Sequence, residues 1–338
     1  MRELAQQLLE TAGRGTPAQP LGRSVLYACR REDGGPVLLV ISECRKQLPG
    51  GFDGEELRLN DGALALVCPY STVNAIALRR HYPWCVPLIP GGERPTVALD
   101  SWEAVAERLS VVRGTGLVPV FPASPSGELR AADAAVFSVF AAGFRDGFTV
   151  DGGRVSSVAG VEKALAESVG LVTLTPGGGN AVGDVAEYAG KRFVLDARDA
   201  VFFSRETAER CAARFGGVVE TAAAVKAKRC APFDLGVALN AEDVPAEAAH
   251  LYLVRELRRC GIDCSVVFPR YPDSPEEFRN AFRIHAAIAA MFGGYKLALP
   301  SAGIPPERFR ELRRECGGML HLEPDMAVWK QFAAYFPA

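Results

Sequence analysis

The feature that most limits the possible folds is a repeat that begins near residue 93. Short apolar runs, each ending in a polar residue, a glycine or a proline, alternate with helical patterns. The runs cover residues 95–100, 117–124, 148–153, 171–177, 233–240, 264–270, 295–301 and 318–324. Near-continuous apolar strands that alternate with amphipathic helices indicate a parallel sheet covered by helices. Eight such units predict a TIM (β/α)8 barrel rather than an open sheet.

The chain before this repeat has a different pattern. A strand pair around a turn at residues 33–35 is followed by a further strand over 64–69 and a helix with Ser71 as its N-cap. We therefore expect an α/β protein of two domains, a small N-terminal α/β domain at 1–92 and a TIM-barrel domain at 93–338. One barrel unit holds an insertion at 178–232, with a helix expected from Ser204 to about Arg214.

Composition excludes several classes of protein. Lys and Arg total 38 and Asp and Glu total 40, which gives a net charge of −2 and predicts neither nucleic-acid nor membrane-surface binding. The start of the chain lacks the apolar run of a signal peptide, so we expect a cytoplasmic protein. The nine cysteines are odd in number and irregularly spaced, which predicts reduced thiols.

A TIM barrel also predicts where a site would lie, because side chains at the carboxyl ends of its strands face the pocket. Polar residues at or just beyond these ends are Asp100, Ser124, Asp151, Thr175, Asn240, Glu242, Asp243, Arg270, Ser301, His321, Glu323 and Asp325.

Four of these positions carry alternative interpretations. His321 and Glu323 share one face of a strand and could both reach a metal ion or a substrate hydroxyl, or they could form a solvated strand end. Asp151 could join His321 at a metal ion, or it could belong to an Asp-Gly-Gly turn. Arg270 could bind a carboxylate through two hydrogen bonds, or it could form a salt bridge at the barrel rim.

Two further patterns favour a plain structural role. The glycine-rich run at Gly177–Gly183 could cradle a phosphate, but it lacks the spacing of the known phosphate-binding loops. His250 and His285 lie in helical patterns and are expected to be packing or surface residues.

Several segments together resemble a known enzyme family. They are LVCPYSTVNAIALRRHYPW, VFSVFAAGFRDGF, YAGKRF, FDLGVALN, ELRRCGIDCSVVFPR, EEFRNAFRIHAAIAAMFGGYKLAL and GGMLHLEP. From about residue 60 to its end, the chain resembles the metal-dependent tagaturonate/fructuronate epimerases. This resemblance implies a TIM-barrel-like fold and a site that interconverts ketohexuronates through a divalent metal.

The chain departs from the pattern of that family at the strand ends. Asp151 and His321 correspond to family metal-site positions, but Gly153 and Arg154 stand where an acid and a histidine are expected. Asn240-Ala241 replaces an Asp-Glu pair. Residues 300–305 keep only Ser301 of a His-Ser-Gly-Ser-Asp-Lys motif, and Glu323 replaces a lysine.

We therefore carry two hypotheses. The first is a diverged relative that is non-catalytic for the family reaction and acts as a sugar-acid-binding protein or as the partner subunit of an active homologue. Its expected assembly is a homo-oligomer or a hetero-oligomer with a homologue. The second is an active sugar-acid epimerase or isomerase with a rebuilt site, whose cofactor is either a divalent metal or none. The candidate residues are Glu323, His321 and Asn240 for catalysis, Arg270, Ser301, Glu242 and Asp100 for substrate binding, and His321 and Asp151 for a metal ion.

Overall fold

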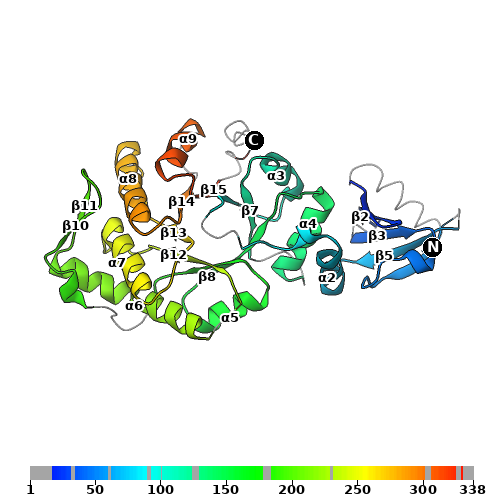
Figure 1. Cartoon of the computed structure of the whole chain (residues 1–338), viewed down its shortest axis with the longest axis horizontal. Coiled ribbons are helices and arrows are strands. Elements are labelled where there is room, and N and C mark those ends of the chain that lie inside the picture. Colours follow the sequence, from blue (N-terminus) through cyan, green and yellow to red (C-terminus); the bar gives the residue numbers. More distant parts are fainter. Residues whose placement is uncertain are drawn as a thin grey trace. The chain divides into compact units, whose positions relative to one another are not determined.

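The computed structural model describes residues 17–31, 35–59, 62–89, 93–99, 101–123, 129–177, 184–228, 231–300, 306–324 and 329 (Figure 1). The chain forms two compact units. Unit 1 contains Met1–Leu88, Ser101–Arg113 and Ser124–Phe148, and unit 2 contains Ile89–Asp100, Gly114–Ala123 and Thr149–Ala338. These units alternate along the chain, and the domain boundary expected near residue 92 stays a prediction.

Unit 1 is built on a five-stranded antiparallel sheet with the order β1-β2-β3-β5-β4. Its strands are β1 (Gln19–Leu21), β2 (Ser24–Arg30), β3 (Pro36–Ser42), β4 (Glu55–Arg58) and β5 (Leu64–Pro69), and its helical segments are η1 (Arg45–Gln47), α2 (Thr72–His81), η2 (Pro83–Cys85), α3 (Val105–Val112) and α4 (Ala131–Ala142). The expected strand pair is confirmed as β2 and β3. The expected N-cap is also confirmed, because the Ser71 hydroxyl accepts a hydrogen bond from the Asn74 N–H.

A buried carboxylate connects two helices of unit 1. Asp133 on α4 is 1 % exposed. It accepts hydrogen bonds from Thr72 Oγ1 at 2.8 Å and Arg130 Nε at 3.2 Å, and it pairs with Arg79. These donors offset the cost of burying the charge and fix α2 against α4.

Unit 2 contains the predicted barrel. Its parallel strands close in the order β12-β13-β14-β15-β6-β7-β8-β9. They are β6 (Thr96–Ala98), β7 (Val118–Phe121), β8 (Thr149–Val155), β9 (Leu171–Leu174), β12 (Asp234–Ala238), β13 (Val266–Phe268), β14 (Lys296–Pro300) and β15 (Leu320–Glu323). Helices between the strands in unit 2 are α5 (Val158–Ala166), α6 (Arg205–Ala227), α7 (Ala246–Arg259), α8 (Pro275–Met291) and α9 (Pro306–Glu315). Each expected apolar run holds one strand, so the TIM-barrel fold with a small N-terminal α/β region is confirmed.

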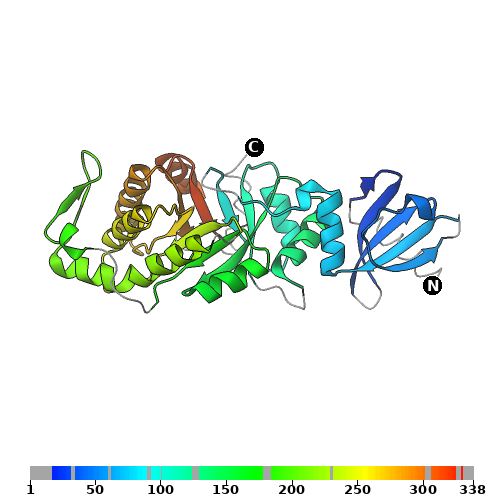
Figure 2. The same ribbon diagram turned by 60° about the horizontal axis from the view of Figure 1, so that its bottom comes forward.

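The insertion after β9 forms a short helical turn, a hairpin and a long helix. Its first elements are η3 (Val185–Glu187), β10 (Arg192–Val194) and β11 (Ala200–Phe202), and the hairpin leads directly into α6 (Figure 2). The expected end of this helix near Arg214 is wrong, because α6 continues to Ala227. Phe215, Gly216 and Val219 are buried, and packing of such a face sustains a helix across residues of low helical propensity.

An apolar cluster lies in the barrel interior. Val120, Leu171, Ala238, Val266, Phe268 and Ala298 form one buried cluster. They come from strands on opposite sides of the closed barrel, so their side chains point inward. Gly236 faces the same space, since a Cβ there would lie 2.6 Å from Thr173 Oγ1 and 3.1 Å from Phe268 Cε2.

A polar network is buried between α7 and α8. His250 Nδ1 lies 2.8 Å from His285 Nδ1, and His250 Nε2 lies 2.5 Å from the Tyr295 hydroxyl. Burial lowers the pKa of His285 to about 3 and lowers the pKa of His250 well below its usual value. Both histidines are therefore packing residues, as the sequence predicted.

In the part of the chain that the structure describes, every helix is too short or too polar to cross a bilayer. The cytoplasmic location stays a prediction.

We predict that Gly236→Ala lowers the free energy of unfolding by about 1–3 kcal/mol, because the new methyl group overpacks the barrel interior. Guanidinium unfolding measures this change. Gly50→Ala is the control, since an added Cβ there meets no atom within 4 Å. Equal stability changes in the two variants would contradict the close packing around Gly236.

We also predict an acid-sensitive stability from the His250–His285 pair. Between pH 6.5 and about 3 the unfolded chain binds protons that the folded chain does not, so the free energy of unfolding falls as pH decreases. The slope is at most about 1.4 kcal/mol per pH unit for each histidine. Unfolding of His250→Leu/His285→Leu measured from pH 7 to pH 4 is expected to show a shallower slope, and an unchanged slope would contradict the burial of these groups.

Candidate functional site

The candidate site begins at the seam where the last barrel strand pairs with the first. His321 on β15 lies opposite Thr96 on β6, and its Nδ1 is hydrogen-bonded to Thr96 Oγ1 at 2.8 Å. The imidazole is 3 % exposed and meets the Phe268 ring edge-on, with centroids 5.3 Å apart. Because Phe268 belongs to the interior cluster, His321 also points into the barrel.

The surroundings of His321 keep its imidazole neutral. Burial lowers its pKa to about 3, and the positive charges of Lys296 and Arg154 add to this shift. Lys296 is the first residue of β14 and is fully buried. Burial lowers the pKa of Lys296 to about 8, while the charge of Asp234 opposes that shift. The barrel interior therefore combines a neutral histidine with nearby cationic side chains.

Arg154 spans the mouth of the barrel. Its guanidinium lies over the Phe268 ring, 5.6 Å from the centroid, and its Nη2 is 3.9 Å from Glu323 Oε1. Arg154 lies on β8 and Glu323 lies on β15, and strands β6 and β7 separate these two strands in the barrel order. The ion pair between Arg154 and Glu323 therefore crosses the opening of the barrel.

A local irregularity of β8 precedes Arg154. The register of β8 against β9 shifts between Asp151 and Arg154, and Gly153 has a φ of +79°. Such bulges redirect side chains at barrel rims, and glycine adopts positive φ without strain.

Two carboxyl groups accompany Arg154. Burial raises the pKa of Asp151, while a hydrogen bond from the Gly153 N–H at 2.9 Å and the charge of Arg154 oppose the shift. Burial also raises the pKa of Glu323, and the negative charge of Asp151 raises this pKa further. The positive charge of Arg154 opposes both effects. Both carboxyls therefore hold a proton at higher pH than a solvated carboxyl does.

The structure brings together only some of the expected site residues. His321, Glu323 and Asp151 interact electrostatically with Arg154. Asn240 is exposed after β12. Arg270 and Glu242 form an exposed ion pair of 3.4 Å beside a surface hollow of about 380 Å³, as the rim alternative predicted. Asp100, Ser301 and Ser124 lie outside the described residues, as do residues 178–183 of the glycine-rich run.

Sequence reasoning did not assign a site role to Thr96, Arg154, Phe268 or Lys296. Lys296 had a detectable signal, because it is a charged residue inside an otherwise apolar strand run, YKLALP. The positions of Arg154 and Phe268 depend on contacts across the closed barrel, which strand periodicity does not encode.

The described residues do not fit the divalent metal that the family resemblance implies. Catalytic zinc typically takes about three protein ligands. Among residues with described positions, no group of three or more His, Cys, Asp or Glu side chains could hold an ion. His321 Nδ1 is engaged by Thr96, and the nearby positive charges of Lys296 and Arg154 oppose a dication. The metal roles of His321 and Asp151 stay predictions without support from this geometry.

We predict that Arg154→Gln raises the pKa of both Glu323 and Asp151, because the guanidinium lowers both. Carboxyl ¹³C chemical shifts followed through a pH titration report each value. Arg192→Gln on β10 is a matched control, since Arg192 is exposed and is not a cause of either shift. Unchanged titration of the two carboxyls in Arg154→Gln would contradict the placement of the Arg154 guanidinium near Glu323 and Asp151.

Comparisons with known proteins agree with the resemblance in the sequence. A sequence model of the family described as tagaturonate epimerase (UxaE) matches residues 19–178. The tagaturonate/fructuronate epimerase of Thermotoga maritima is 20 % identical over 350 residues, covering 89 % of this chain and 70 % of that protein.

Solved structures share the fold. The glycerol-complexed fructuronate-tagaturonate epimerase of Cohnella laeviribosi is 21 % identical with a TM-score of 0.76, over 96 % of this chain and 75 % of that one. Its native structure is 20 % identical with a TM-score of 0.75, over 98 % and 76 %. The resemblance to the tagaturonate/fructuronate epimerase family is confirmed.

Proposed function

We propose that the barrel mouth binds a sugar acid of the ketohexuronate class and that the chain does not carry out metal-dependent epimerisation. The observation that carries this proposal is the placement of Arg154 and Lys296 beside the neutral His321. Positive charge at this position favours an anion over a dication. Tagaturonate and fructuronate, which appear in the names of the relatives of this chain, are the first ligands to test.

Arg154 is the proposed carboxylate-binding residue. Its guanidinium is oriented over Phe268, and its 3.9 Å separation from Glu323 is longer than a hydrogen bond. Its donors can therefore form a two-point contact with a ligand carboxylate. The pKa values of Asp151 and Glu323 are raised, so these carboxyls take up a proton at higher pH than a solvated carboxyl does, and a carboxyl in its protonated form can donate to a sugar hydroxyl.

A second candidate function is sugar-acid epimerisation or isomerisation by a rebuilt, metal-free site. The observation that favours it is the pair of carboxyl groups whose pKa values are raised beside one cation. General acids and bases work best when their pKa lies near the working pH. In this alternative Glu323 and Asp151 move protons on and off a sugar that Arg154 holds by its carboxylate.

Calorimetric titration tests the binding proposal. Tagaturonate or fructuronate is expected to bind, and Arg154→Gln is expected to weaken binding by about 10- to 100-fold, the effect of one lost charged hydrogen-bonding contact. Arg192→Gln and the uncharged sugars tagatose and fructose are the controls. Absence of uronate binding, or equal affinity in Arg154→Gln, would contradict the proposal.

An NMR assay of uronate conversion separates the two candidates. No conversion is expected for the binding protein, with or without added Mn²⁺ or Zn²⁺. Conversion that resists chelators and falls about 100-fold or more in Glu323→Gln would instead favour the second candidate. Conversion that requires a metal ion would contradict both. Assembly with a second copy or with a homologue stays a prediction.

A further inference from the structure

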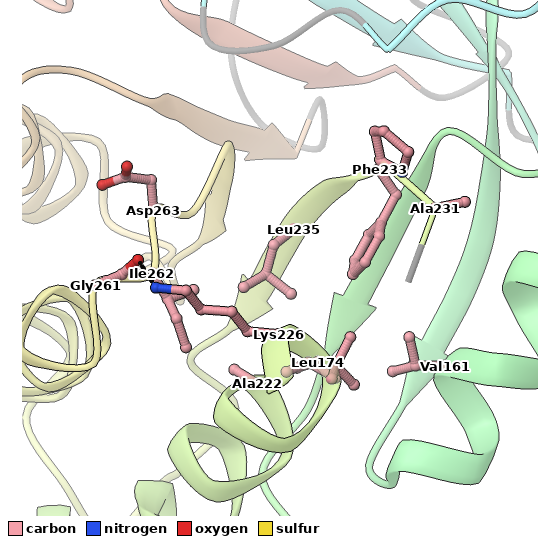
Figure 3. Close-up of a pocket in the computed structure, with 12 residues that line it drawn as sticks. Val161, Leu174, Ala222, Lys226, Ala231, Phe233, Leu235, Gly261, Ile262 and Asp263 are labelled. Atoms are coloured by element: carbon pink, nitrogen blue, oxygen red, sulfur yellow. Dashed lines mark hydrogen bonds between the residues drawn. The ribbon is translucent and has the colours of Figure 1, made fainter. Parts of the chain in front are cut away.

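A separate cavity lies on the outer side of the barrel wall. It has a volume of about 320 Å³ and is lined from α5, β9, α6, β12 and the loop between α7 and β13 (Figure 3). This volume is at the lower end of the range of about 300–1,000 Å³ for small-molecule sites. None of its lining residues belongs to the mouth around Arg154.

The body of the cavity is apolar. Val161, Leu174, Ala222, Leu235 and Ile262 contribute aliphatic surface, and the Phe233 ring enters from the other side (Figure 3). A buried water needs about two to four polar partners, which such a lining does not supply. The cavity therefore suits the hydrocarbon part of a ligand better than ordered water.

One end of the cavity carries a positive charge. Lys226 Nζ donates to the carbonyl oxygen of Cys260 at 3.1 Å. It also donates to the carbonyl oxygen of Gly261 at 2.5 Å, beyond the end of α7 (Figure 3). These bonds use two of the three ammonium donors. Asp263, the acidic residue of the lining, pairs with Arg258 Nε at 2.9 Å. Its charge is thus balanced by Arg258, whereas the two described hydrogen bonds of Lys226 go to neutral carbonyls.

The position of the Lys226 ammonium is constrained by its neighbour. Gly261 has a φ of +65°, and a Cβ on this residue would lie 2.8 Å from Lys226 Nζ. The absence of a side chain at Gly261 lets the ammonium approach the backbone there. A charged group is thereby held at the edge of an apolar space.

We propose that this cavity binds a small amphiphilic carboxylate, of the class of medium-chain fatty acids such as octanoate. The hydrocarbon chain contacts Val161, Leu174 and Leu235, and the carboxylate accepts the third hydrogen bond of Lys226. This site is separate from the proposed sugar-acid site, so either can fail without the other.

Methyl-labelled NMR spectra of the full chain, titrated with octanoate, test this site. Methyl shifts are expected at Val161, Leu174 and Leu235. Affinity is expected to rise about fourfold per methylene, or about 15-fold from hexanoate to octanoate. Lys226→Met is expected to weaken octanoate binding about two- to fivefold, typical of a partly exposed ion pair, and to leave 1-octanol binding unchanged.

Two variants make the test specific. Lys228→Met is the matched control, since Lys228 lies after the same helix and pairs with Glu162 rather than lining the cavity. Ala222→Leu places added side-chain volume in the cavity and is expected to abolish binding while the other methyl signals show an intact fold. The proposal is overturned by octanoate binding without shifts at the lining methyls, by unchanged affinity in Lys226→Met, or by no binding.

Discussion

The hydrogen bond between Thr96 and His321 joins the first and last strands of the barrel across 225 residues of sequence. It forms between the two residues that face each other in the β6–β15 register, so it depends on correct closure of the barrel. The same closure buries His321 against Phe268 and brings Glu323 to the side of the mouth opposite Arg154. The whole candidate site therefore depends on this seam.

Burial at the seam also decides the electrostatics. A buried imidazole beside Lys296 and Arg154 stays neutral, and the two carboxyls of the mouth titrate at raised pH. A site of this kind differs from a metal centre, in which carboxylates and histidines converge on a dication. The chain thus shares the fold of the solved uronate epimerases, whereas we propose that the described part of its mouth binds an anion.

Much of the fold could be predicted because strand and helix periods are local properties of the sequence. The barrel strands, the β2–β3 pair and the Ser71 cap follow from such patterns. The length of α6 could not be predicted in this way, since its continuation through Gly216 depends on packing with distant elements.

The site was partly predictable for the same reason. His321 and Glu323 share a strand face because side chains alternate along a strand. Position at a strand end does not decide whether a loop side chain turns inward, and Asn240 and Arg270 are exposed. The position of Arg154 depends on long-range contacts across the barrel mouth.

Equilibrium dialysis of the purified chain against Mn²⁺ and Zn²⁺, with His321→Ala and Asp151→Asn measured in parallel, decides between an anion site and a metal centre at the barrel mouth. We expect no ion whose binding depends on either residue. A stoichiometric ion that is lost in both variants would contradict it, because these side chains would then form a metal centre rather than part of an anion site.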